Sequence, residues 1–332
     1  MPTRLAGRRS GLLMTPFSPR RLPGLVGWWD SALSPKTLRT TSHVGSGTVT
    51  QSGTTLTGTL SAFLSEVVVG DVITADAGSP LISGTVTAIA SNTSLTLSTS
   101  ATQAVGQTYT VAPVAGTSDR VSQWDDLSGF GGHVSKAGVT AQPALVPGGA
   151  GGMPYLLFDG VNDGLQATDG DQLKITGALT LFAVYRFVAL ANFAAILNKG
   201  DGTTAAGSAY EIVLDNSVPQ VINADTFIGA VKTSAAGASP TAGTDYMAMM
   251  TRTAAGAITL YVNGASVGTA SDGGAALNNP TNPVGFGQAG DGTPLEANLR
   301  LYAVAIVNRL LSDRERWQTE RYYSRRTGIA VS

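Results

Sequence analysis

The sequence has no cysteine among its 332 residues and only two histidines, His43 and His133. The absence of cysteine excludes a disulfide framework and any zinc or iron–sulfur site built on thiolates, and it fits folding in a reducing bacterial cytoplasm. The histidines lack the close spacing typical of metal ligands, so we expect neither a metal centre nor a catalytic triad built on them.

Charge is also scarce. Charged residues make up 13% of the chain and the net charge is -1, so no global field would attract nucleic acid or an anionic membrane, and we expect neither as a partner. No apolar run approaches the ~18 residues needed to span a bilayer. The N-terminal segment lacks the long apolar stretch and cleavage site of a secretion signal, so we expect no export signal.

Turn-forming and β-branched residues are abundant instead. The chain contains 41 Gly and 15 Pro, and its Val, Ile and Thr runs are separated by Gly, Ser, Asn and Asp, which is typical of strands joined by short loops. The run 179–187 is almost continuously apolar and predicts a strand buried on both faces. Asn263-Gly264 predicts a two-residue hairpin turn, because both positions accept a positive φ. We therefore expect an all-β fold.

Only the C-terminal end is expected to be helical. The segment Ser312-Asp313-Arg314-Glu315 is a capping box, in which Ser312 and Glu315 each bond to the other's backbone. The helix should run to about Arg325 and close at Gly328, with Trp317 and Tyr322 or Tyr323 as its buried stripe.

Basic residues are distributed unevenly, with none between Thr40 and Asp119. Residues 1–22 are rich in both Arg and Pro, which predicts an extended basic arm. One interpretation is a disordered tail; the other is an arm that docks on a neighbouring subunit. The residues that would dock are Arg4, Arg8, Arg9, Leu12, Leu13, Met14, Phe17, Arg20 and Arg21.

The sequence of residues 44–113 predicts an inserted domain. Short β-branched runs at close spacing predict a small antiparallel barrel or sandwich, and the absence of a titratable cluster favours a spacer or surface-contact role. The main domain would then comprise residues 23–43 and 114–332.

Five segments of the main domain resemble those of a known superfamily. They are residues 24–30 (GLVGWWD), 121–129 (VSQWDDLSG), 158–163 (FDGVND), 261–264 (YVNG) and 310–315 (LLSDRE). Together they resemble the laminin-G/concanavalin A-like jelly-roll superfamily, in the version common in bacteriophage structural proteins, and the insertion of residues 44–113 is the departure from that pattern.

The resemblance implies a lectin-like jelly-roll sandwich more strongly than it implies a function, because one fold hosts many activities. The function it implies is that of a non-enzymatic virion protein: a capsid decoration, head fibre or tail component. We expect such a protein to assemble in the bacterial host cytoplasm, with other virion proteins as partners and as a homo-oligomer or symmetric array. The alternative is a glycan-binding module for host-surface carbohydrate.

Two oxygen-rich loops are candidates for glycan or calcium binding. Their residues are Trp124, Asp125 and Asp126 in the first loop and Asp159, Asn162 and Asp163 in the second. Calcium requires six to eight oxygen ligands, and a tryptophan can stack on a sugar ring. The alternative is structural: Asp and Asn cap backbone N–H groups in turns, and Trp124 packs in the core. Apart from calcium, no cofactor is expected.

Paired carboxylates of the kind that glycosidases need are nearly absent. The nearest candidates are Glu211 and Asp215, four residues apart and therefore on one face of a strand. A solvated strand face explains this isolated pair more simply, so we expect no catalytic residues and no enzymatic activity.

Overall fold

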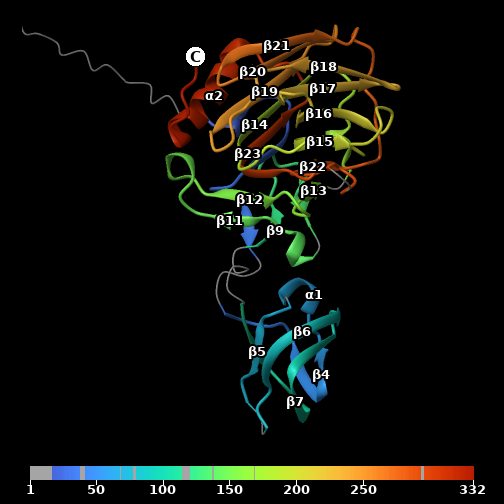
Figure 1. Ribbon diagram of the computed structural model, residues 1–332, viewed down its shortest axis with the longest axis vertical. Helices are drawn as coiled ribbons and strands as arrows, with labels where there is room; N and C mark the ends of the chain where they lie inside the picture. The colour runs from blue at the N-terminus through green and yellow to red at the C-terminus, as the bar shows by residue number, and fades with distance from the viewer. Residues whose placement is uncertain are drawn as a thin grey trace, which may run out of the picture.

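The computed structural model describes residues 17–37, 42–67, 69–77, 80–113, 120–136, 138–167, 169–292 and 295–332. Within these ranges the strands form three antiparallel sheets. Two of the sheets lie together and the third lies apart from them (Figure 1). The expected all-β architecture is confirmed.

The first sheet has eight strands. In order across the sheet they are β11 (Ala144–Val146), β12 (Tyr155–Asp159), β23 (Asn298–Val307), β14 (Leu179–Phe187), β19 (Tyr246–Arg252), β20 (Ala257–Val262) and β21 (Ala265–Ser271), and β1 (Leu25–Asp30) also pairs with β23. Strand β14 is buried at every position except Arg186, as its unbroken apolar sequence predicts. The β20–β21 turn has φ of 50° at Asn263 and 87° at Gly264, which confirms the predicted hairpin.

The second sheet has nine strands and packs face to face against the first. In order they are β18 (Val231–Ala236), β17 (Ile222–Ile228), β16 (Ser208–Leu214), β15 (Ala194–Gly200), β22 (Val284–Phe286), β13 (Leu165–Ala167), β10 (Val134–Ser135), β9 (Val121–Trp124) and β2 (Pro35–Thr37). Side chains such as Leu181 and Tyr185 of β14 share one buried cluster with Ile212 of β16. That cluster is the main core of the protein.

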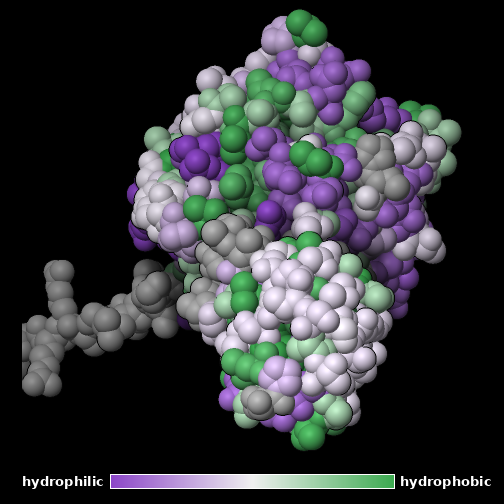
Figure 2. Space-filling model, turned by 60° about the horizontal axis from the view of Figure 1, so that its bottom comes forward, coloured by the Kyte–Doolittle hydropathy of each residue, from purple (hydrophilic) through white to green (hydrophobic). Residues whose placement is uncertain are grey.

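The third sheet is formed by the residues expected to be an insert. Its order is β3 (His43–Val44), β8 (Tyr109–Ala112), β5 (Val72–Ala75), β6 (Ser83–Ser91), β7 (Ser94–Gln107) and β4 (Thr48–Thr59), with helix α1 (Phe63–Glu66) beside it. A separate apolar cluster around Phe63, Ile73 and Tyr109 lies within it. Its surface, turned forward in Figure 2, is mostly pale, of intermediate hydropathy, which matches its lack of Lys and Arg. The exact domain boundaries stay a prediction.

Helix α2 (Asp313–Thr327) confirms the predicted helix. Both hydrogen bonds of the capping box are present, and Gly328 ends the helix with a φ of 76°. No helix among the described residues is both long and apolar enough to cross a lipid bilayer. Short 3-10 turns lie at Pro19–Arg21, Val139–Ala141, Ala150–Gly152 and Asp171–Leu173.

The buried stripe of α2 differs in part from the expectation. Tyr323 is fully buried and its ring lies 5.2 Å from that of Phe182, but Trp317 is 50% exposed. The reason is helical spacing: Thr319, which is buried, and Tyr323 lie four residues apart on the face toward the sheet, and position 317 does not share that face. Trp317 instead packs under the guanidinium of Arg321.

The adjacent tryptophans of β1 point to opposite faces, as alternation requires. Trp29 lies in the core between the sheets, where its ring meets Phe286 edge-on. Trp28 lies on the other face, and its Nε1 donates a 2.8 Å hydrogen bond to the Tyr323 hydroxyl. The Tyr323 hydroxyl in turn donates to Asp30 at 3.2 Å. These contacts hold α2 against the eight-stranded sheet, so both faces of that sheet are covered.

The expected arm of residues 1–22 is shorter than its sequence suggests. Residues 17–22 pack on the domain, because Pro19 and Leu22 are buried and the Phe17 ring meets Tyr322 edge-on at 6.2 Å. The segment that could act as a free arm therefore ends at residue 16.

A buried ion pair ties the eight-stranded sheet to the loop that follows β21. The side chains of Arg252 and Asp272 are 0% and 2% exposed. Arg252 donates to both carboxylate oxygens, at 2.6 and 3.0 Å, and also to the carbonyls of Gly177 and Ala275. Each of the three guanidinium nitrogens donates to an acceptor, and loss of the carboxylate would leave an uncompensated buried charge.

We expect Asp272→Asn to lower the free energy of unfolding by about 3–5 kcal/mol, the usual cost of breaking a buried pair from one side. Urea denaturation measures this. The matched control is Asp171→Asn, whose side chain is 97% exposed in its pair with Lys174 and which should change stability by less than about 1 kcal/mol. Equal stability of the two variants would contradict the prediction.

Candidate functional site

The outer face of the nine-stranded sheet carries the candidate site. Side chains alternate between the two faces of a strand, and in β16 Tyr210, Ile212 and Leu214 belong to the core between the sheets. Glu211 and Val213 therefore point outward. In β17 Ala224 belongs to the same core, so Asp225 points outward beside Glu211.

The strand register builds a row of polar side chains across this outer face. Asn198 of β15 lies opposite Glu211, Glu211 lies opposite Asp225, and Asp225 lies opposite Ser234 of β18. The Asn198 amide donates to Glu211 Oε2 at 2.5 Å, and its oxygen accepts the backbone N–H of Gly290 at 3.1 Å. Asn198 is therefore held in one orientation and holds the carboxyl group of Glu211.

Two acidic groups of the row are buried. Glu211 is 6% exposed and Asp225 is 0% exposed. Burial, together with the neighbouring Asp225 carboxylate, raises the pKa of Glu211 to about 8, so Glu211 carries a proton at neutral pH. The Lys232 ammonium lies 3.2 Å from Asp225 Oδ2 and compensates that charge.

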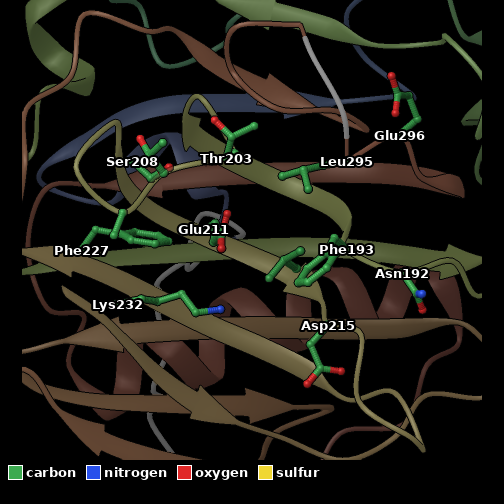
Figure 3. A pocket seen from close by; sticks show the side chains of 14 residues that line it. Asn192, Phe193, Thr203, Ser208, Glu211, Asp215, Phe227, Lys232, Leu295 and Glu296 are labelled. Atoms are coloured by element: carbon green, nitrogen blue, oxygen red, sulfur yellow. The ribbon is translucent and has the colours of Figure 1, made fainter. Parts of the chain in front are cut away.

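A hollow of about 580 Å³ opens above this row. Figure 3 shows Glu211 in the middle of it, with Phe227 and Lys232 on one side and Phe193 and Leu295 on the other. The lining residues are Asn192, Phe193, Gly202, Thr203, Thr204, Ala205, Ser208, Glu211, Val213, Asp215, Phe227, Lys232, Leu295 and Glu296. Strands β16 to β18 supply the floor, and the loops before β15, before β16 and before β23 supply the rim.

Two rim residues hold a backbone conformation that large side chains rarely adopt. Phe193 has a φ of 56° and Leu295 a φ of 88°. Such conformations cost of order 1–3 kcal/mol each and concentrate at ligand-binding sites. Here they present two apolar side chains to the hollow, and Phe193 remains 43% exposed.

The predicted site residue Trp124 is not available to a glycan. It is fully buried, and its ring meets Phe286 edge-on at 6.1 Å within the core between the sheets. The structural alternative for this tryptophan is therefore correct, because its strand directs it inward.

The acids that follow Trp124 bind neighbouring groups of the protein. Asp126 accepts the backbone N–H groups of Trp28, Ser128 and Gly132 at 2.8–3.0 Å. Asp125 lies 3.3 Å from Nδ1 of His133. Asp126 therefore caps the loop, as the structural alternative predicts.

The second predicted loop is organised in the same way. Asp159 accepts the N–H groups of Val161, Asn162 and Asp163 at 2.8–3.4 Å, and Asp163 pairs with Arg120 at 3.2 Å. Burial raises the pKa of Asp163 to about 6, although Arg120 opposes this shift. Among the described residues, no three acidic or histidine side chains gather as they would around a metal ion.

The predicted docking arm is only partly described. Arg4, Arg8, Arg9, Leu12, Leu13 and Met14 lie outside the described residues. Phe17 packs on Tyr322, whereas Arg20 and Arg21 are exposed at the start of the domain.

Glu211 and Asp215 share one face, as predicted, because both line the hollow. The prediction that this face is solvated is wrong at Glu211, which is buried. Sequence reasoning missed Asp225, Asn198 and Lys232. A signal for Asp225 existed in the alternation of β17, which places Ile222 and Ala224 inward and Asp225 outward.

We expect the free energy of unfolding to depend on pH through the ionisation of Glu211. Because its pKa is raised from 4.5 to about 8, the folded state holds a proton that the unfolded state has lost, so stability falls as pH rises through this window. Glu211→Gln mimics the protonated acid. Relative to the wild type it should gain at least about 2 kcal/mol between pH 5 and 9, measured by urea denaturation, whereas Asp171→Asn should follow the wild type. A constant difference between Glu211→Gln and the wild type would contradict this.

Comparison with known proteins gives one family match, and no curated protein matches the chain. Among solved structures, the binding domain of Paraclostridial Mosquitocidal Protein 1 is 14% identical with a TM-score of 0.45, over 62% of this chain and 53% of that one. The binding domain of botulinum neurotoxin serotype G is 13% identical with a TM-score of 0.44, over 60% and 49%. This chain thus spans about half the length of each structure.

The family match covers residues 159–315, which include strands β13 to β23 and the start of α2. The family is described as the concanavalin A-like lectin/glucanases superfamily. This region contains most strands of the two packed sheets and every residue that lines the hollow, whereas β1, β2 and β9 to β12 precede it or end where it begins. Residues 159–315 are therefore similar to the concanavalin A-like lectin/glucanases superfamily, in agreement with the all-β jelly-roll fold of the two packed sheets.

Proposed function

We propose that the jelly roll is a non-enzymatic carbohydrate-binding module and that the hollow above Glu211 is its binding site. The observation that carries this proposal is the combination, in one hollow, of apolar side chains with a buried row of hydrogen-bonding groups. Its volume of about 580 Å³ lies in the range of small-molecule sites, which join apolar walls to a few fixed polar groups.

The chemistry of the lining suits a sugar ring. The C–H faces of a sugar are apolar and would pack against Phe193 and Phe227, while its hydroxyl groups both donate and accept hydrogen bonds. Glu211 in its protonated form also donates and accepts. Asn198 fixes the Glu211 carboxyl group, so little side-chain freedom would be lost on binding.

The arrangement of the acids supports binding without hydrolysis. Retaining glycosidases place two carboxyl groups about 5–5.5 Å apart on either side of the scissile bond. Glu211 and Asp225 are instead direct cross-strand neighbours, and Asp225 is wholly buried and paired with Lys232. These two acids cannot flank a ligand from opposite sides.

We further propose that the protein is a structural component of a bacteriophage virion, as a capsid decoration, head fibre or tail component, with the jelly roll available for host adhesion. The resemblance of the five sequence motifs supports this role. Packing of Phe17 on Tyr322 also supports it, because a docking arm formed by residues 1–16 would leave the domain from a fixed point beside α2.

We expect Phe193→Ala to weaken glycan binding at least about tenfold, because an exposed aromatic side chain that packs on a ligand contributes about 1.5 kcal/mol or more. A glycan array identifies the ligand and isothermal titration measures its affinity. The matched control is Phe130→Ala, since Phe130 is also exposed, at 60%, and does not line the hollow. The bound oligosaccharide should be recovered uncleaved. Equal affinities of the two variants, or release of reducing ends that Glu211→Gln abolishes, would contradict the proposal.

Deletion of residues 1–16 should leave the unfolding midpoint of the domain unchanged and prevent its incorporation into virions. Residues 17–22 must be kept, because Leu22 is part of the packed core. Mass spectrometry of purified particles measures incorporation against the full-length chain. Particles that contain the truncated chain at full stoichiometry would refute docking through the arm.

A further inference from the structure

The hollow has an excess of acidic groups. Among its lining residues Glu211, Asp215 and Glu296 are acidic, and Lys232 is the sole basic one. A partly buried site strengthens electrostatic interactions with whatever enters it. The sign of the charge around the hollow therefore bears directly on which ligands it accepts.

The one cation of the hollow is already compensated. Lys232 Nζ lies 3.2 Å from Asp225 Oδ2, and Asp225 sits directly behind Glu211 on the neighbouring strand. The Glu211 side chain also forms a hydrogen bond with the Asp225 side chain, and Lys232 adds the compensating positive charge as an ion pair. A carboxylate-bearing ligand would have to compete with Asp225 for this ammonium.

The remaining charged groups near the hollow do not reverse this balance. Asp215 accepts the N–H groups of Ser217 and Val221 through Oδ1 and is an acidic residue of the lining. Asp201, in the loop before β16, adds another carboxylate, which caps Thr203 and Thr204. Burial lowers the pKa of Lys136, although the charge on Glu296 opposes this shift; the amine donates to Gln288 at 2.7 Å and does not line the hollow.

We propose that this hollow selects glycans that carry a protonated amine, such as oligosaccharides of unacetylated amino sugars, over their neutral and carboxylate-bearing counterparts. This inference rests on the proposed function of the site. The ammonium group would donate hydrogen bonds to the Glu211 carboxyl group and interact with the rim carboxylates of Asp215 and Glu296, while the ring packs on Phe193. Charge-assisted hydrogen bonds of this kind are stronger than neutral ones.

Binding of an amine has a consequence that binding of a neutral sugar lacks. An ammonium group beside Glu211 would favour its ionised form and so lower its pKa from about 8. At a pH low enough for the free ligand's amine to be protonated already, the complex would then release a proton. A neutral sugar brings no charge to Glu211 and would release none.

The test compares matched ligands on the full-length protein. An array carries each backbone in three forms, with free amines, with N-acetylated amines and with carboxylates; glucosamine and N-acetylglucosamine oligomers are the first pair. We expect the free-amine form to bind at least about tenfold more tightly at neutral pH and low salt, a difference of about 1.4 kcal/mol. Titration calorimetry in two buffers of different ionisation enthalpy should show proton release for that form alone.

Two variants test whether residues of the hollow cause the preference for amines and the proton release. Glu296→Gln should reduce the preference for the amine, and Glu211→Gln should abolish the proton release, while Asp171→Asn, which removes a charge outside the hollow, should change neither. If neutral or carboxylate-bearing glycans bind as tightly as amines, the amine selectivity is refuted and the binding module stands. If no glycan binds, the proposed function and this inference are both refuted.

Discussion

The alternation of side chains across the nine-stranded sheet constrains everything that the outer face of that sheet can do. One face must be apolar, because it packs against the eight-stranded sheet and forms the main core. Side chains at every second position therefore point the other way, and Glu211 and Asp225 meet there because the β16–β17 register places them opposite each other. A shift of one residue in either strand would turn these acids toward the core, where an unpaired carboxylate is costly.

The two sheets differ in how their outer faces are covered. Helix α2 and the segment from Phe17 to Leu22 pack on the eight-stranded sheet, through contacts such as that between Phe182 and Tyr323. Its strands β1, β14, β19 and β23 are accordingly buried on both faces over most of their length. The outer face of the nine-stranded sheet is bordered by loops around a hollow instead. This asymmetry leaves a hollow on the outer face of the nine-stranded sheet, above the buried acids Glu211 and Asp225.

The fold could be predicted from local patterns because each of its key elements is encoded by neighbouring residues. The capping box at Ser312, the Asn263-Gly264 turn and the apolar run of β14 all depend on sequence neighbours, and all three are present as expected. The exposure of Trp317 was mispredicted because a helix with two aromatic positions can orient in more than one way. Which position is buried depends on the shape of the sheet that receives the helix.

The candidate site could be predicted only in part. That Glu211 and Asp215 share a face follows from strand periodicity, but the burial of Glu211 depends on loops from distant parts of the chain, which carry Phe193 and Leu295. The pairing of Glu211 with Asp225 depends on a register that no local pattern specifies. The loops around Asp126 and Asp159 were candidates for glycan or calcium binding because their sequences are rich in oxygen ligands. The structure shows both carboxylates bound to backbone N–H groups.

We propose that ligands bind to this protein on the outer face of β16 to β18. The most direct measurement is an NMR titration of the isotopically labelled protein with a glycan that it binds, followed through the backbone amide signals. If ligands bind in the hollow, the perturbed signals should cluster around it, at residues 192–193, 202–208, 211–215 and 295–296. Perturbations centred instead on the loops at Asp126 and Asp159, or on the third sheet, would contradict it.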